Sequence, residues 1–111
     1  MMTEALISVI MSSYNSEKTI RRSILSILNQ DYKNLEFLIV DDCSTDNSLS
    51  IIKKLGENDK RIKIIENKKN IGLTKSLNKL LKISKGKYIA RQDSDDASFS
   101  HRLTSQINFL K

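Results

Sequence analysis

The chain has 111 residues, and 19 lysines and arginines against 13 aspartates and glutamates give it a formal net charge of +6 at pH 7. This length suits one domain with a modest hydrophobic core, and the positive charge favours anionic partners such as nucleotides, nucleic acid or acidic lipid headgroups. The single cysteine excludes an internal disulfide framework and a cysteine-based zinc site, as expected in a reducing compartment.

The N-terminal segment predicts the first strand of a soluble domain, followed by a helix. Glu4 stands where a signal peptide carries positive charge, and the apolar run of residues 6–11 is too short to cross a bilayer. The small polar residues 12–16 suit a turn and a helix cap. Residues 17–29 then carry apolar side chains at helical spacing, which predicts an amphipathic helix.

The same pattern recurs further along the chain. Residues 35–40 (LEFLIV) predict a second strand, residues 41–46 a polar loop, and residues 47–55 a helix. Residues 61–66 (RIKIIE) alternate in part, as in a strand nearer the sheet edge, and residues 67–70 form a basic polar loop.

A third helix and a fourth strand complete the pattern. The inner face of this helix is marked by Leu73, Leu77, Leu80, Leu81 and Ile83, and Gly86 is interpreted as its end. Residues 88–90 predict a short strand, residues 91–96 (RQDSDD) a loop, and residues 101–110 a last helix.

Strands that alternate with helices predict an α/β fold with an open, mostly parallel sheet and helices on both faces. Residues 1–111 are expected to form one unit, and because the sequence stops within or at the end of a helix, that unit is expected to be incomplete. Ligands of such sheets bind beyond the carboxyl ends of the strands. The polar segments after the four predicted strands should therefore share one edge of the sheet.

The acidic loop is the most unusual of these segments. Three carboxylates within four positions repel one another unless a metal ion, a basic side chain or solvent compensates their charge. Asp93 and Asp95, two positions apart, can point toward the same pocket while Ser94 faces elsewhere. Oxygen ligands of this kind suit Mg²⁺ or Mn²⁺, which keep other positions for water and substrate phosphates.

Four segments stand in order along the chain: ISVIMSSYNSEKTIRRSILSILNQDYKNLEFLIVDDCSTDNS, NKKNIGLTKSLN, GKYIARQDSDD and HRLTSQINFL. Together they resemble the N-terminal half of a family 2 glycosyltransferase with the Rossmann-like GT-A fold, over nearly the whole chain. The resemblance implies binding of a nucleotide-diphosphate sugar, most often a UDP-sugar. It also implies sugar transfer, with inversion, to a growing polysaccharide or a lipid-linked glycan.

The resemblance also implies roles for individual residues around the nucleotide. Ser12 and Tyr14 would line the base pocket, with Tyr14 stacking near the uracil. Asp42 would accept a hydrogen bond from the base, and Asp41 would support the same loop.

The diphosphate side of the donor is assigned in the same way. Asp93 would reach the ribose or a metal-bound water, and Asp95 would ligate the Mn²⁺ or Mg²⁺ ion that bridges the phosphates. Lys75 is a candidate for contact with the diphosphate. The metal would neutralise the charge that grows on the departing nucleoside diphosphate.

The chain departs from the family pattern at three places. Ser12 replaces a usual proline but keeps a hydroxyl, and Lys75 stands near a usual arginine without its bidentate fork. Ser100 and His101 stand where a proline and an acidic residue are common. The acceptor pocket and the general base of this family belong to a second half that the sequence does not contain. Asp96 is therefore not assigned as the base, and the chain alone is expected to bind a donor without transferring its sugar.

Two other functions are compatible with parts of the sequence. A dinucleotide-binding oxidoreductase needs a glycine-rich turn after the first strand, and residues 12–16 contain no glycine. A non-catalytic nucleotide- or nucleic-acid-binding module suits the net charge, but the acidic edge would repel a phosphate backbone and no aromatic stacking platform is visible, so no nucleic-acid partner is expected.

The expected location is the cytoplasm, where the lysine-rich surface would suit contact with anionic lipid at the inner face of the cell membrane. Self-association is also expected, because a half-domain would expose apolar surface.

Overall fold

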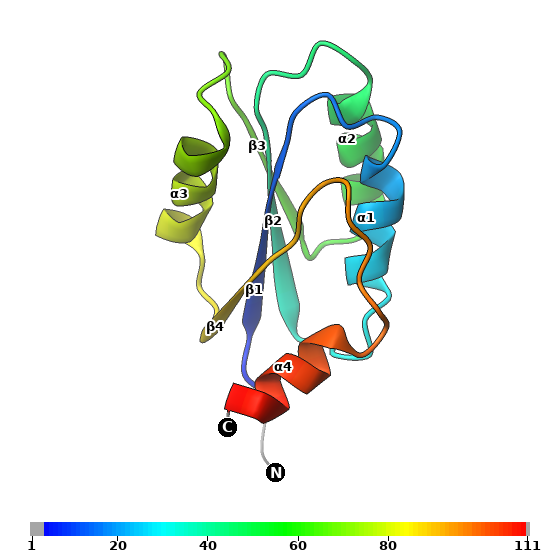
Figure 1. Ribbon diagram of the computed structural model, residues 1–111, viewed down its shortest axis with the longest axis vertical. Helices are drawn as coiled ribbons and strands as arrows, with labels where there is room; N and C mark the ends of the chain where they lie inside the picture. Colours follow the sequence, from blue (N-terminus) through cyan, green and yellow to red (C-terminus); the bar gives the residue numbers. More distant parts are fainter. Residues whose placement is uncertain (1–3, 111) are drawn as a thin grey trace.

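The computed structural model describes residues 4–110, in which strands and helices alternate along the chain (Figure 1). The elements are β1 (Ile7–Ser13), α1 (Ile20–Leu28), β2 (Leu35–Asp41), α2 (Ser48–Asn58), β3 (Ile62–Glu66), α3 (Leu73–Ile83), β4 (Tyr88–Arg91) and α4 (Arg102–Leu110). Each element predicted from the sequence is present, and the ends agree within three residues. Among the described residues, no helix is both long and apolar enough to cross a membrane.

Two predicted boundaries near the first turn were wrong. Ser12 and Ser13 belong to β1 rather than to the following turn, because the parallel ladder continues through the pairs Ser12 with Val40 and Ser13 with Asp41. The helix expected from residue 17 begins at Ile20. It follows a turn in which the Ser16 carbonyl accepts hydrogen bonds from the backbone N–H groups of Thr19 and Ile20. Ser12 is thereby held at the end of a central strand.

The sheet has the strand order β3-β2-β1-β4, and every neighbouring pair is parallel. The chain adds β2 and β3 on one side of β1 and then returns to place β4 on the other side. In open α/β sheets, such a reversal of strand order leaves a crevice at the carboxyl ends of the two strands concerned. Here these strands are β1 and β4.

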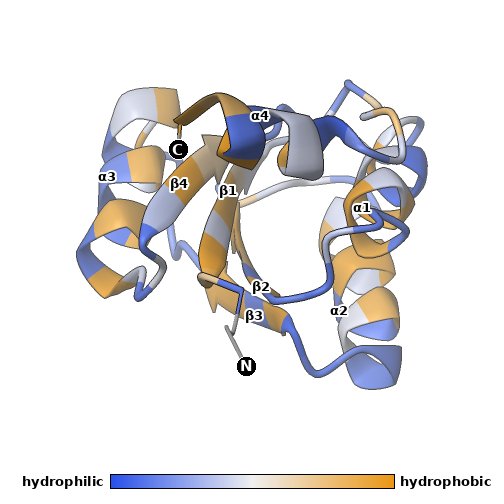
Figure 2. Cartoon of the chain, turned by 90° about the horizontal axis from the view of Figure 1, so that it is seen from below, coloured by the Kyte–Doolittle hydropathy of each residue, from blue (hydrophilic) through white to orange (hydrophobic). Residues whose placement is uncertain are grey.

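Helices cover both faces of the sheet, as predicted (Figures 1 and 2). On one face, α1, α2 and α4 bury the larger core, which includes Phe37 of β2 and Ile24 of α1, both with no exposed surface. On the other face, α3 packs alone, with Leu80 against Ile10, Leu38 and Val40. Side chains that alternate along the strands therefore pack into two separate hydrophobic cores, one on each face of the sheet.

Gly86 has a role that differs from the predicted one. The helix already ends at Ile83, so Gly86 does not terminate it, and its φ is not positive. A Cβ at Gly86 would instead stand 2.4 Å from the backbone nitrogen of Ser8 in β1. Glycine is required here because the chain passes close to the central strand as it enters β4.

Replacing Gly86 with alanine is expected to destabilise the fold by about 2 kcal/mol or more, since a backbone atom in the sheet must move. Thermal unfolding should show a melting temperature lower by roughly 10 °C. Gly56→Ala is the matched control, because the nearest atom to its Cβ would be the flexible end of Ile64, at 3.1 Å, with Ile62 at an ordinary contact distance of 3.5 Å, and alanine favours the helix. Equal melting temperatures for the two variants would contradict the close-approach argument.

Glu36 in β2 is a buried carboxylate that joins neighbouring strands. Its side chain accepts hydrogen bonds from the Ser8 hydroxyl, from the Lys85 backbone N–H at 2.7 Å and from Lys63 Nζ at 3.3 Å. Burial raises the pKa of Glu36, but these three donors outweigh it and hold the pKa below its ordinary value of 4.5.

Because the folded pKa is lowered, Glu36 stabilises the fold above pH 4.5 and loses this contribution as pH falls through the folded pKa. Urea unfolding should therefore show the largest difference in stability between the native chain and Glu36→Gln near pH 7. The difference should shrink as pH falls below 4.5 and through the folded pKa, because the protonated carboxyl resembles the amide. A difference that does not change with pH would show that the charge of Glu36 is irrelevant.

Candidate functional site

A cleft of about 680 Å³ opens at the carboxyl ends of β1 and β4, where the strand order reverses. This volume lies in the usual range for pockets that bind small molecules and cofactors. The lining residues come mainly from the segments after these two strands, and they are Ser12, Tyr14, Asn15, Ser16, Glu17, Lys18, Thr19, Asp46, Leu73, Arg91, Asp93, Ser94 and Asp95.

Hydrogen bonds join the loops after β1, β2 and β4 into one rim. Thr45 donates its backbone N–H to Asn15 Oδ1 at 2.8 Å, and Asn15 donates its own to Ser44 Oγ at 3.0 Å. Asn15 has a φ of 47°, in the left-handed region that asparagine tolerates better than most residues. Ser16 Oγ lies 2.8 Å from Ser94 Oγ on the opposite side. The cleft is thus built from segments far apart in the sequence.

The structure brings together four of the residues singled out in the sequence. Ser12 and Tyr14 line the cleft from the β1 side, and Asp93 and Asp95 line it from the β4 side. Tyr14 is 49% exposed, so its ring is available to a planar ligand. Ser94 also lines the cleft, so the expectation that it faces elsewhere was wrong.

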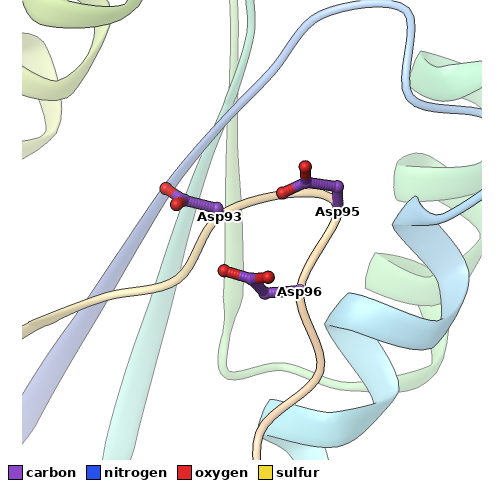
Figure 3. Close-up of side chains that lie close together, drawn as sticks. All are labelled: Asp93, Asp95 and Asp96. Atoms are coloured by element: carbon purple, nitrogen blue, oxygen red, sulfur yellow. The ribbon is translucent and has the colours of Figure 1, made fainter.

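Asp93, Asp95 and Asp96 follow one another around the bend of the loop after β4 (Figure 3). One carboxylate oxygen from each lies within 4.8 Å of the other two. Within residues 4–110, only Asp93 of these three forms an ion pair, with Arg91 Nε at 2.9 Å. Because oxygen ligands of concentrated negative charge suit Mg²⁺ and Mn²⁺, the loop fits a hard divalent cation.

Arg91 and Lys18 are cationic lining residues that the sequence analysis missed. Arg91 is the last residue of β4, and its side chain is about half exposed at the mouth of the cleft. Its place directly before the acidic loop could have marked it. Lys18 offered no comparable signal, because it was expected to lie within a helix rather than in the turn before it.

Asp42 lies outside the lining residues and is 3% exposed. Its Oδ1 accepts hydrogen bonds from Asn67 Nδ2 at 2.9 Å and the Ile71 N–H at 2.8 Å, and its Oδ2 accepts from the Gly72 N–H at 2.9 Å. Burial raises the pKa of Asp42, but these donors outweigh it and the pKa is lowered. The carboxylate thus fixes the loop before α3, where Gly72 has a φ of 91°.

Lys75 is exposed in the first turn of α3 and is not among the cleft's lining residues, whereas Leu73 of the same turn is. Asp41 is buried at the end of β2 and accepts hydrogen bonds from the Ser44 N–H and hydroxyl. It therefore supports the loop after β2, in the manner that the sequence suggested.

Proteins similar to this chain include enzymes and solved structures. The Escherichia coli protein named UDP-Glc:alpha-D-GlcNAc-diphosphoundecaprenol beta-1,3-glucosyltransferase WfaP is 42% identical over 106 residues, which cover 96% of this chain and 41% of WfaP. S. aureus TarS, residues 1–349, in complex with UDP-GlcNAc has a TM-score of 0.86 at 36% identity, covering 94% of this chain and 30% of that structure.

A third similar protein is the mannosyltransferase PcManGT from Pyrobaculum calidifontis, in complex with GDP-Man and Mn²⁺. Its TM-score is 0.87 at 26% identity, covering 94% of this chain and 32% of that structure. Similarity to TarS and PcManGT over nearly the whole chain confirms the predicted GT-A fold.

The chain spans about two fifths of the length of the curated relatives that it matches at 51% and 42% identity, with 38% and 41% covered. Residues 8–111 match the model of the family described as Glycosyl transferase family 2. The predicted family is therefore confirmed: this chain belongs to glycosyltransferase family 2.

Proposed function

We propose that the cleft binds a UDP-sugar together with Mn²⁺ or Mg²⁺, and that the chain supplies the donor-binding part of a glycosyltransferase. The observation that carries this proposal is the convergence of Ser12 and Tyr14 with Asp93 and Asp95 in one cleft. These side chains supply an aromatic face, hydroxyl groups and metal-binding oxygens, which are the groups that a nucleotide diphosphate requires.

The proposed roles follow the position of each side chain. Tyr14 stacks near the uracil, and Ser12 offers its hydroxyl to the base from the end of β1. Asp95 ligates the metal, and Asp93 reaches the ribose or a metal-bound water. When bound, the metal stabilises negative charge on the departing nucleoside diphosphate.

Two assignments need a further step. The Asp42 carboxylate already accepts three hydrogen bonds, so contact with the base would use its remaining acceptor capacity on Oδ2. Lys75 would have to extend from the first turn of α3 toward the diphosphate, because it lies outside the lining. Both remain predictions.

The names of the similar proteins support a UDP-sugar over other donors. WfaP is named for UDP-Glc, and TarS was solved with UDP-GlcNAc. Both have higher sequence identity to this chain, 42% and 36%, than PcManGT at 26%, which was solved with GDP-Man. PcManGT also supports a divalent metal, because Mn²⁺ is present in its complex. The name of WfaP includes a diphosphoundecaprenol acceptor, which favours a lipid-linked or growing glycan here as well.

We further propose that transfer proceeds with inversion and requires an acceptor site and a general base outside residues 1–111. Without them the chain binds the donor but does not transfer the sugar. A lipid-linked acceptor would place the protein in the cytoplasm at the inner face of the cell membrane, where lysines could contact anionic headgroups.

Calorimetric titration of UDP into the folded chain tests the proposal. With Mn²⁺ present, we expect saturable binding, weakened at least about tenfold when EDTA removes the metal. GDP and ADP are the comparators for the base, and both should bind more weakly than UDP. Absence of UDP binding would overturn the donor assignment, whereas equal binding in EDTA would overturn the metal alone. Salt-dependent RNA binding without UDP binding would favour the nucleic-acid-binding function instead.

A further inference from the structure

Polar side chains along one side of α1 and its flanking residues hold the segment that carries the acidic loop. Thr19, Ser23, Ser26 and Gln30 recur at intervals of four, three and four residues, which places them on one helix face. Each of the four side chains has at least one hydrogen-bond partner in residues 93–103. This face of α1, which we name the polar face, is thus matched to a segment about 70 positions away.

The hydrogen bonds of the polar face go to backbone groups of that segment. Thr19 Oγ1 donates to the Ser94 carbonyl at 2.9 Å, and Ser23 Oγ donates to the Asp93 carbonyl at 2.8 Å. Further along, Ser26 Oγ accepts the Ser98 N–H at 3.0 Å, and Gln30 bonds to the Phe99 carbonyl and the Leu103 N–H. The polar face therefore fixes the path of the loop backbone, whatever side chains the loop carries.

Burial makes the loss of these hydrogen bonds costly. Ser23 and Gln30 have no exposed surface, and a buried polar group without a hydrogen-bond partner destabilises the fold. Serine is also a mediocre residue for a helix interior, where alanine would be more favourable. If Ser23 served only to fill the core, alanine would do so and would favour the helix more. The Ser23 hydroxyl is therefore explained by its hydrogen bond to the loop.

Gln92 and Arg102 add further hydrogen bonds to the same loop. The Gln92 side chain is nearly buried, and its Nε2 donates to Ser23 Oγ at 3.1 Å and to the Asp96 carbonyl at 2.9 Å. Its Oε1 accepts from Arg102 Nη1 at 2.8 Å, while Arg102 Nη2 donates to the Arg91 carbonyl at 2.8 Å. Both ends of the acidic loop are thereby tied to α1 and α4.

We propose that Ser23, Gln92 and Arg102 are positioning residues that hold the acidic loop in the shape in which Asp93 and Asp95 can bind a divalent cation together. This inference rests on the proposed function, because it assigns a purpose to the loop geometry. None of the three residues lines the donor cleft. They would act through the loop backbone, as residues behind a metal site do when they orient its ligands.

Ser23→Ala is the first test, with Ile27→Val as the matched control in the same helix. Ile27 is fully buried in the core, and its shortening lowers stability modestly without removing a hydrogen bond to the loop. Mn²⁺ affinity is measured by electron paramagnetic resonance, and amide hydrogen exchange of residues 93–98 is measured without metal. We expect Ser23→Ala to weaken Mn²⁺ binding about tenfold and to speed loop exchange, and Ile27→Val to change neither beyond its effect on global stability.

Arg102→Met gives a second test, because a positioning role and a purely electrostatic role of Arg102 predict opposite changes in Mn²⁺ affinity. Burial of the Arg102 guanidinium lowers its pKa. The negative charges of Asp96 and Asp93 nearby raise the pKa, but by less, so it stays below its ordinary value. Removing a positive charge beside a cation site should tighten Mn²⁺ binding if charge alone matters. Positioning predicts weaker binding instead, and Arg102→Lys should show an intermediate loss because lysine lacks the fork that reaches two partners.

Mn²⁺ binding by the native chain that is unchanged in Ser23→Ala, or tightened in Arg102→Met, would overturn the positioning role and leave the proposed metal site intact. A native chain that binds no Mn²⁺, alone or with UDP, would overturn the metal site and this inference with it. Weaker Mn²⁺ binding in both variants, with Ile27→Val unchanged, would support the inference.

Discussion

Asp95→Asn is expected to weaken Mn²⁺ binding on the order of 100-fold, a loss of about 2.7 kcal/mol. Asp95 is exposed, lines the cleft and has an oxygen within 4.8 Å of oxygens from Asp93 and Asp96. The amide keeps the shape of the side chain but removes the negative charge that a hard cation requires. UDP binding in the presence of Mn²⁺ should fall toward the level measured with EDTA, while the melting temperature stays within about 2 °C, as expected for an exposed position.

Asp96→Asn is the matched control for this prediction. Asp96 belongs to the same acidic group but lines the smaller neighbouring pocket beside Arg102 rather than the donor cleft. Its replacement should weaken Mn²⁺ binding less than about tenfold, through the loss of one nearby charge. A larger loss for Asp96→Asn than for Asp95→Asn would show that the metal, if bound, lies on the other side of the loop.

Asp42→Ala is expected to lower the free energy of unfolding by about 3 kcal/mol or more. The substitution removes the acceptor of two backbone N–H groups, those of Ile71 and Gly72, and of the buried Asn67 amide. Each donor left without a partner costs about 1–3 kcal/mol, although relaxation and water entry recover part of the total. Since a domain of this size is stable by only about 5–15 kcal/mol, urea unfolding should show the loss clearly.

Asp42→Asn separates a role in the fold from a role at the base. The amide retains one acceptor oxygen, so it should keep more of the stability than alanine does, while the Gly72 N–H or the Ile71 N–H loses its partner. If Asp42 acts only by ordering the loop before α3, the variant that disorders this loop more should also lose more UDP affinity. A stable Asp42→Ala chain that no longer binds UDP would show instead that the carboxylate serves the base directly.

Strand and helix positions followed from the sequence because the apolar pattern carries most of that information. Residues 35–40 are buried on both faces of a central strand, so a mostly apolar run marks them, with Glu36 as its one charged residue. Ser12 and Ser13 were missed as strand residues because they are polar and small. They belong to β1 because they pair with Val40 and Asp41 of β2. The role of Gly86 was missed because it depends on Ser8, which comes close only in the folded chain.

The candidate site was predictable where residues follow strands directly. Tyr14 follows β1 closely, and Asp93 and Asp95 follow β4, so the rule for parallel sheets brought them to one edge. Asp42 obeys the same rule, yet it turns into the loop before α3 instead of lining the cleft. Backbone position fixes the edge on which a residue lies, whereas side-chain direction depends on donors from distant segments.

The polar face of α1 could not be found from the sequence. Ser23 and Ser26 stand among apolar residues of a helix, where a serine carries no distinctive signal. The Asp93 carbonyl and the Ser98 N–H that they bond lie about 70 positions away and are backbone groups, which any residue type would supply.

A crystal structure of the chain with UDP and Mn²⁺ tests the central claim most directly, because anomalous scattering locates the metal independently of the nucleotide. The account predicts a Mn²⁺ peak in contact with Asp95 and the diphosphate, with the uracil beside Tyr14 in the cleft between β1 and β4. A metal or a nucleotide found outside this cleft, or a folded chain whose crystals contain neither at saturating concentrations, would contradict it.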